Sequence, residues 1–119
     1  MDAISMVRVA EWLFILAALG GIVMAGIRFG SGRNPPVLIP YLHGLLAGAG
    51  LTLLLYAAWL GGLPGSVTIA IVLLLVAAAG GSILNLAYHW RQVPIPKGLT
   101  AAHILLAVSG VGLLLPVAF

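Results

Sequence analysis

The chain has 119 residues, of which 63% are hydrophobic and only 6% are charged, and its mean hydropathy is +1.26. Because a soluble domain carries about 25% charged residues, this composition excludes a water-facing globular surface and indicates an integral membrane protein. The absence of cysteine excludes disulfides, cysteine-ligated zinc, iron–sulfur clusters and c-type haem attachment. The net charge of +3 rests on five basic residues beside apolar segments, which favours a role in membrane topology over nucleic-acid binding.

Four apolar segments follow one another along the chain, and each is close to the roughly 20 residues that cross the hydrocarbon core of a bilayer. They cover about Met6–Ile27, Leu38–Leu60, Val67–Tyr88 and Leu99–Ala118. We expect all four to be helices, because lipid offers backbone groups no other hydrogen-bond partner. The sequence therefore predicts an all-α integral membrane four-helix bundle, with residues 1–119 forming a single transmembrane domain.

Basic residues gather at two of the three connections between these segments. Four of the five flank the loops at 29–37 and 89–98: Arg28, Arg33, Arg91 and Lys97. Since cytoplasmic loops carry an excess of lysine and arginine, we expect both loops to be cytoplasmic and both termini to lie outside, in the inner membrane of a bacterium. Arg8 is the exception, and Glu11, three residues later on the same helix, is expected to neutralise it.

The chain repeats itself at a spacing of 60 residues, the distance from His43 to His103. Residues 43–55 and 103–115 share the pattern H-x-L-L-A-x-x-G-x-x-L-L-L. The same register, without a gap, also matches two glycines and a proline: Gly20 and Gly21 with Gly80 and Gly81, and Pro36 with Pro96. Leucine and alanine matches arise easily by chance in such an apolar chain, but matched histidines, glycines and prolines in one register do not. We therefore expect a tandem duplication of a two-helix hairpin, with repeats at 1–60 and 61–119.

The repeat also predicts how the two histidines are placed. Each repeat contributes two spans, so the repeats should be related by an axis along the membrane normal. His43 and His103 then lie at equal depth, about one turn inside the second and fourth segments. Each shares a helix face with the alanine four residues on and the glycine seven residues on. We expect these faces to meet at the centre and to leave a slot for a flat macrocycle.

Paired histidines at this depth point to haem chemistry. Neutral imidazole is a good iron ligand, and two imidazoles can take both axial positions of a haem. We therefore predict that His43 and His103 are the metal ligands of one haem b held between the second and fourth helices. Arg28, Arg91 and Lys97 would bind its propionates. Two alternatives stay open, namely simple packing through small residues and hydrogen bonds, and a site for another pigment, a quinone or an ion.

The histidine-bearing segments IPYLHGLLAGAGLTLLL (39–55) and LTAAHILLAVSGVGLLL (99–115) resemble those of b-type membrane cytochromes, the cytochrome b-561 class and its short bacterial relatives. The resemblance covers about a third of the chain. It implies haem b bound by two histidines between helices, and electron transfer to or from quinones or similar donors. The chain departs from two-haem members, because all three histidines fall on one side of the membrane. At most one such haem follows.

Other functions remain open alongside electron transfer. A four-helix chain with almost no mass outside the bilayer also fits a non-catalytic or pigment-binding accessory subunit of a larger respiratory or photosynthetic membrane complex. Glu11, the one acid within a span, would suit a small proton-coupled transporter, although a pair with Arg8 is the simpler interpretation. His89, at the end of the third span, is expected to be an interfacial side chain, or a donor to a propionate or a quinone.

The sequence carries no sign of hydrolytic or nucleotide chemistry. It has no Ser–His–Asp set, no phosphate-binding glycine loop and no pair of acids, so no catalytic residue is predicted and enzymatic activity is left open. The expected partners are the lipid bilayer and either a quinone or a larger membrane complex, with no nucleic acid. Self-association into a homo-oligomer is compatible with the sequence.

Overall fold

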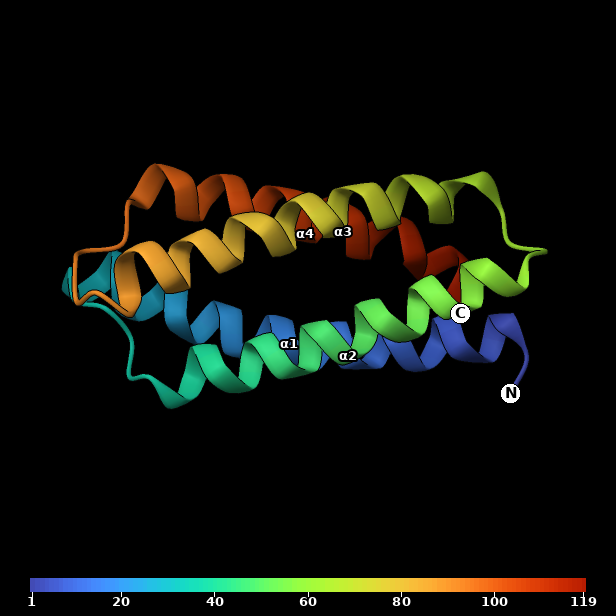
Figure 1. Ribbon diagram of the computed structural model, residues 1–119, viewed down its shortest axis with the longest axis horizontal. Coiled ribbons are helices and arrows are strands. Elements are labelled where there is room, and N and C mark those ends of the chain that lie inside the picture. Colours follow the sequence, from blue (N-terminus) through green and yellow to red (C-terminus); the bar gives the residue numbers. More distant parts are fainter.

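The computed structural model describes all 119 residues and is a bundle of four long helices (Figure 1). They are α1 at Ala3–Ser31, α2 at Leu38–Leu60, α3 at Gly65–Ile83 and α4 at Lys97–Ala118. A π-helical segment, η1 at Leu84–His89, continues α3 without a break. All four helices, with η1 counted in the third, are long and apolar enough to cross a membrane, so the predicted all-α class of four helices is confirmed.

Helix α1 is longer at both ends than the predicted Met6–Ile27, because specific caps extend it. Asp2 is the N-cap, and its carboxylate accepts a 2.7 Å hydrogen bond from the backbone N–H of Ser5. Hydrogen bonds from the backbone and side chain of Ser5 lower the pKa of Asp2. At the other end the chain reverses at Gly32, whose φ of 70° is the left-handed conformation common after helices.

The third span ends differently from the first, although the two occupy equivalent positions in the repeat. In η1 the helix widens, and the N–H of Trp90 donates to the carbonyl of Asn85 five residues earlier at 2.7 Å. Gln92 then takes a φ of 56°, at the position that Gly32 holds 60 residues earlier. Such single π-turns are rare and frequently mark functional sites.

The helices pack as two hairpins laid against each other (Figure 1). Backbone contact is closest between α1 and α2 and between α3 and α4, and α1–α4 and α2–α3 contacts complete the ring. The predicted central interface between the second and fourth helices is therefore wrong, since α2 and α4 stand at opposite corners. The loops joining α1 to α2 and α3 to α4 share one end, and the α2–α3 link and the termini share the other.

The small-residue faces of α2 and α4 pack inside each hairpin instead. A Cβ at Gly50 would lie 3.0 Å from the Phe14 ring and 3.2 Å from the Ala10 carbonyl, both on α1. A Cβ at Gly110 would lie 2.7 Å from Leu74 and 3.3 Å from the Ala70 carbonyl, both on α3. These glycines let each helix approach its hairpin partner closely, so no slot for a macrocycle opens at their level.

Close packing is confined to one half of the bundle. Of the 19 buried residues, only Pro35, Leu84 and Ile95 lie in the stretches 18–49 and 78–109, which form the half nearest the two loops. The other half holds one apolar cluster that includes Phe14, Leu54, Leu74 and Leu114. The repeats also bury the same positions, pairing Val7 with Val67, Ala10 with Ala70, Ala17 with Ala77 and Leu54 with Leu114.

The outer surface of the bundle is apolar along its length. Large side chains stand exposed on every helix, among them Trp12, Leu45, Ile69 and Leu105. Water disfavours such a continuous surface, whereas lipid tails do not. With 19 of 119 residues buried and outward faces of this kind, the fold is consistent with an integral membrane protein.

Candidate functional site

His43 and His103 are held in the same way on the two hairpins. Nδ1 of His43 lies 2.7 Å from the carbonyl oxygen of Ala17, and Nδ1 of His103 lies 2.8 Å from that of Ala77. Each carbonyl belongs to the residue 26 positions before its histidine. Since a carbonyl oxygen only accepts hydrogen bonds, Nδ1 carries the proton in both rings. In the neutral imidazole the Nε2 atom then keeps its lone pair, which is the state that binds a metal.

The two imidazole rings meet at the centre of the bundle. Their centroids are 6.2 Å apart and their planes are inclined at 68°. The helices that carry them stand at opposite corners, so the side chains alone bridge the gap. The sequence analysis expected His43 and His103 to face one axis from matching helix positions; their rings lie side by side here, although the helix contact expected around them is not formed.

Each ring rests against a glycine of the neighbouring helix. A Cβ at Gly81 would lie 3.0 Å from Cε1 of His103, and a Cβ at Gly21 would lie 3.4 Å from Cε1 of His43. At Gly81 even a methyl group would require the ring to shift, whereas at Gly21 a methyl group would make ordinary contact with the ring. The sequence comparison matched Gly21 with Gly81 but assigned neither a role, because only the fold shows that they stand beside the histidines.

The spacing of the two rings is compatible with ligation of one haem iron. Two imidazoles that bind one metal from opposite sides, with metal–nitrogen bonds of about 2 Å, have ring centroids roughly 6 Å apart. Hydrogen bonds from the distal ring nitrogen to backbone carbonyls are the usual way of orienting histidine ligands. Direct edge-to-face packing of the two rings also falls within the observed spacing, which is the simple packing alternative.

The space for a macrocycle differs from the sequence prediction. On the side of the histidines toward the termini lies the closely packed cluster that includes Phe14, Leu54, Leu74 and Leu114. Toward the loops the only buried residues are Pro35, Leu84 and Ile95, and small residues such as Gly20 and Ala47 are partly exposed. The side of the rings toward the loops is therefore the less closely packed one.

The basic residues predicted to hold propionates lie at that loop end, but they are not equivalent. Nε of Arg28 donates to the carbonyl of Ile95 at 2.7 Å, and its Nη1 donates to that of Gly32 at 2.6 Å. Arg28 therefore ties the two loops together in this structure. Arg91 and Lys97 are exposed. Their positive charges remain available to an anionic group at this end.

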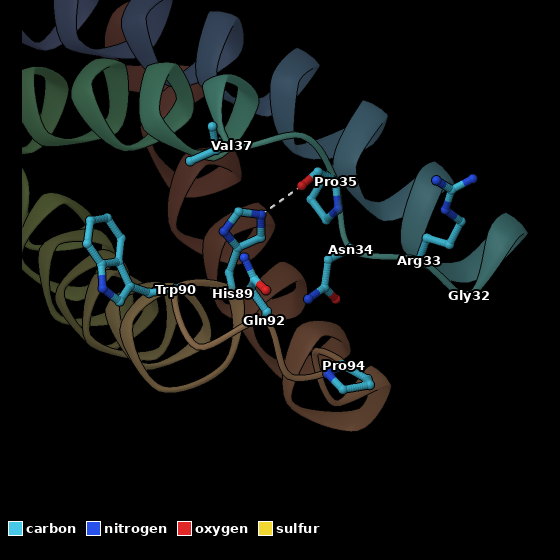
Figure 2. A pocket seen from close by; sticks show the side chains of 9 residues that line it. All are labelled: Gly32, Arg33, Asn34, Pro35, Val37, His89, Trp90, Gln92 and Pro94. Carbon is cyan, nitrogen blue, oxygen red and sulfur yellow. Dashed lines mark hydrogen bonds between the residues drawn. The ribbon is translucent and has the colours of Figure 1, made fainter.

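The two loops are joined by further side-chain hydrogen bonds, of which Figure 2 shows the one between His89 and Pro35. The Asn34 amide donates to the Val93 carbonyl at 2.8 Å and accepts from the Ile95 N–H at 3.1 Å. Nε2 of His89 donates to the Pro35 carbonyl at 2.7 Å. Together these contacts frame an open groove of about 830 Å³ at the loop surface. His89 lines this groove.

Glu11 and Arg8 do not form the predicted ion pair. Glu11 is fully buried, and neither carboxyl oxygen has a hydrogen-bond partner. Arg8 is exposed, and its Nε donates to the carbonyl of Ala118 on α4 at 2.8 Å. The last carbonyls of a helix lack partners within the helix, and Arg8 satisfies one of them. The prediction was wrong because the carbonyl of Ala118, at the end of α4, competes with Glu11 for Arg8.

No known protein family, no curated protein and no solved structure matches this chain.

Proposed function

We propose that this chain is a membrane-embedded b-type haem protein that transfers electrons, with one haem ligated by His43 and His103. The observation that carries the proposal is the pair of imidazoles, each anchored through Nδ1 to a backbone carbonyl, with centroids 6.2 Å apart. Two such ligands leave no open coordination position, which favours electron transfer over oxygen chemistry. When bound, the haem iron would supply a one-electron redox centre.

In this proposal the chain's own groups perform three tasks. The carbonyls of Ala17 and Ala77 hold the rings in one orientation and strengthen Nε2 as a ligand. The packed cluster on the termini side keeps water from the rings. Arg91 and Lys97, with Arg28 where it is released from the loops, neutralise the carboxylates of the macrocycle.

The proposal includes membrane insertion and an origin by duplication of the hairpin. Four apolar spans support insertion, with the basic loops on the cytoplasmic side and the termini outside. The shared positions of buried residues and the two identical histidine anchors support duplication. The redox partner would be a quinone or a larger complex within the same bilayer, approaching at the loop end.

The direct test is a reduced-minus-oxidised absorption spectrum of the protein purified in detergent from haem-replete cells. We expect sharp b-type bands and one haem per chain. His43→Ala and His103→Ala should each abolish the bands. His103→Gln should abolish them too, because glutamine offers no imidazole nitrogen to the iron. Glutamine can still donate a hydrogen bond to the Ala77 carbonyl, so this variant removes the ligand while keeping the anchor.

His89→Ala is the matched control, since His89 bonds the Pro35 carbonyl at the loop surface and should leave the bands unchanged. A colourless wild-type protein would leave the histidines as packing residues of an accessory subunit. Bands that persist in both His43→Ala and His103→Ala would place any haem elsewhere.

A further inference from the structure

Glu11 is the least satisfied polar group of the molecule. Its side chain has no exposed surface, and both oxygens lack a partner. It sits in the closely packed half of the bundle, one turn from Val7 and from Phe14 on α1. Burying a carboxylate without donors is so unfavourable that such groups become neutral instead. A carboxyl in this place therefore holds a proton.

Packing does not explain why a carboxyl is found there. The equivalent residue of the second hairpin is Ile71, which packs partly buried against the same cluster. The molecule thus contains its own comparison, in which an aliphatic side chain fills this position without the cost of burying a polar group. Placing an ionisable residue within a membrane helix costs free energy, so such a residue is interpreted first as functional.

Few charged groups lie near Glu11. On α1 they are Arg8, one turn closer to the helix start, and the exposed Asp2 at its cap. The halves of α2, α3 and α4 beside Glu11 carry no basic or acidic side chain, and the carboxyl of Phe119 follows directly after Ala118. Arg8 is the one basic side chain near Glu11, with the ammonium of Met1 two residues before α1, and Arg8 is bound to the carbonyl of Ala118.

We propose that Glu11 is a proton-binding site, reached from the end of the bundle where the termini lie, and that Arg8 reports its state. With Glu11 protonated, Arg8 ties α1 to α4 through Ala118. When the carboxyl O–H releases its proton to water, the carboxylate draws the Arg8 guanidinium, which keeps its own charge throughout. The bond to Ala118 breaks, and the end of α4 separates from α1. This site is independent of the haem.

The end of α4 has a natural reporter. The rings of Trp12 on α1 and Phe119 pack edge to face with centroids 5.6 Å apart, next to the bond between Arg8 and Ala118. Trp59→Phe and Trp90→Phe would leave Trp12 as the single tryptophan of the chain. Its fluorescence then follows the contact between α1 and α4.

The experiment combines infrared difference spectroscopy with this fluorescence during a pH titration of the full chain in nanodiscs. The chain has only two acidic side chains, so the carbonyl stretch of a protonated carboxyl is readily assigned. We expect that band at neutral pH, its loss on alkalinisation, and a Trp12 change over the same pH range. Glu11→Gln and Glu11→Ile, which copies Ile71, should lack both responses.

Arg8→Gln separates proton binding at Glu11 from the Arg8–Ala118 contact. The carboxyl band should remain and titrate, while the pH-dependent Trp12 change disappears. The absence of a protonated carboxyl band in the wild-type protein at neutral pH would overturn the proposal. So would a Trp12 response that survives in both Glu11 variants. Haem content is not a readout here, so failure of this site and failure of the haem site are distinguishable.

Discussion

The imidazole rings of His43 and His103 lie edge to face at the centre of the bundle, 6.2 Å apart between centroids, although their helices stand at opposite corners. The relationship depends on two anchors per ring. One is the hydrogen bond to a carbonyl, and the other is a glycine against the Cε1 edge. A small displacement at either anchor should therefore change how the two rings face each other.

Gly81→Ala should disturb the histidine pair. Its new methyl group would lie 3.0 Å from Cε1 of His103, closer than ordinary contact, so the ring must shift. Overpacking of this kind costs about 1–3 kcal/mol, which corresponds to a roughly 5- to 150-fold loss of haem affinity. Haem per chain after dilution measures it. Gly80→Ala meets nothing within 4 Å and should retain its haem, so equal losses would contradict the glycine's role.

Gly110→Ala should weaken the second hairpin. A Cβ there would lie 2.7 Å from Leu74 and 3.3 Å from the Ala70 carbonyl, so α4 must move away from α3. We expect a loss of about 1–3 kcal/mol in the free energy of unfolding, measured by denaturant titration in detergent micelles. Gly112→Ala has open space and should be neutral or more stable, since alanine favours a helix by about 1 kcal/mol. Similar stabilities for the two variants would show that the α3–α4 contact is looser than described.

The helices themselves were predictable from the sequence because lipid permits little else. Four apolar runs of the right length had to be helices, and Leu38–Leu60 was predicted with the bounds that the structure has. The 60-residue repeat predicted matching positions for His43 and His103, and their rings lie side by side. The additional turn at each end of α1 depends on capping by Asp2 and Gly32, which hydropathy does not register.

The packing partners were not predictable. Lipid is as apolar as the helix faces, so hydropathy does not say which neighbour a small-residue face contacts, and Gly50 proved to face α1. The Arg8–Glu11 pair failed for a similar reason, since the competing acceptor at Ala118 is 110 residues away in sequence. Nothing in the composition of Leu84–His89 distinguishes a π-turn from an α-turn.

Gln92→Gly should stabilise the chain. Gln92 is the one non-glycine residue with positive φ, at 56°, and a side chain in this conformation costs about 1–2 kcal/mol. Glycine, which already occupies the equivalent position 32, removes that cost, so the free energy of unfolding should rise by about 1 kcal/mol. Gln92→Ala, which keeps a Cβ, serves as the comparison. A glycine variant no more stable than the alanine variant would indicate that Gln92 contributes contacts of its own.

Asn34→Ala should loosen the two loops. It removes the donor to the Val93 carbonyl and the acceptor for the N–H of Ile95, a buried residue that is then left with an unpaired donor. Such a loss costs about 1–3 kcal/mol. Hydrogen exchange at the Ile95 amide should accelerate roughly tenfold or more, while the amide of Leu54 in the packed half should be unaffected. Unchanged exchange at Ile95 would mean that water replaces the lost acceptor.

The membrane orientation can be read from single cysteines, because the chain contains none of its own. Ser31, at the end of α1, and Gly65, at the start of α3, are both exposed and lie at opposite ends of the bundle. Four of the five basic residues flank the end at Ser31, so we expect that end in the cytoplasm. A membrane-impermeant thiol reagent applied to intact cells should then label Gly65→Cys but not Ser31→Cys. After lysis both should be labelled, which controls for access to each site. Labelling of Ser31→Cys alone in intact cells would reverse the orientation, and would place the Glu11 proton site on the cytoplasmic side.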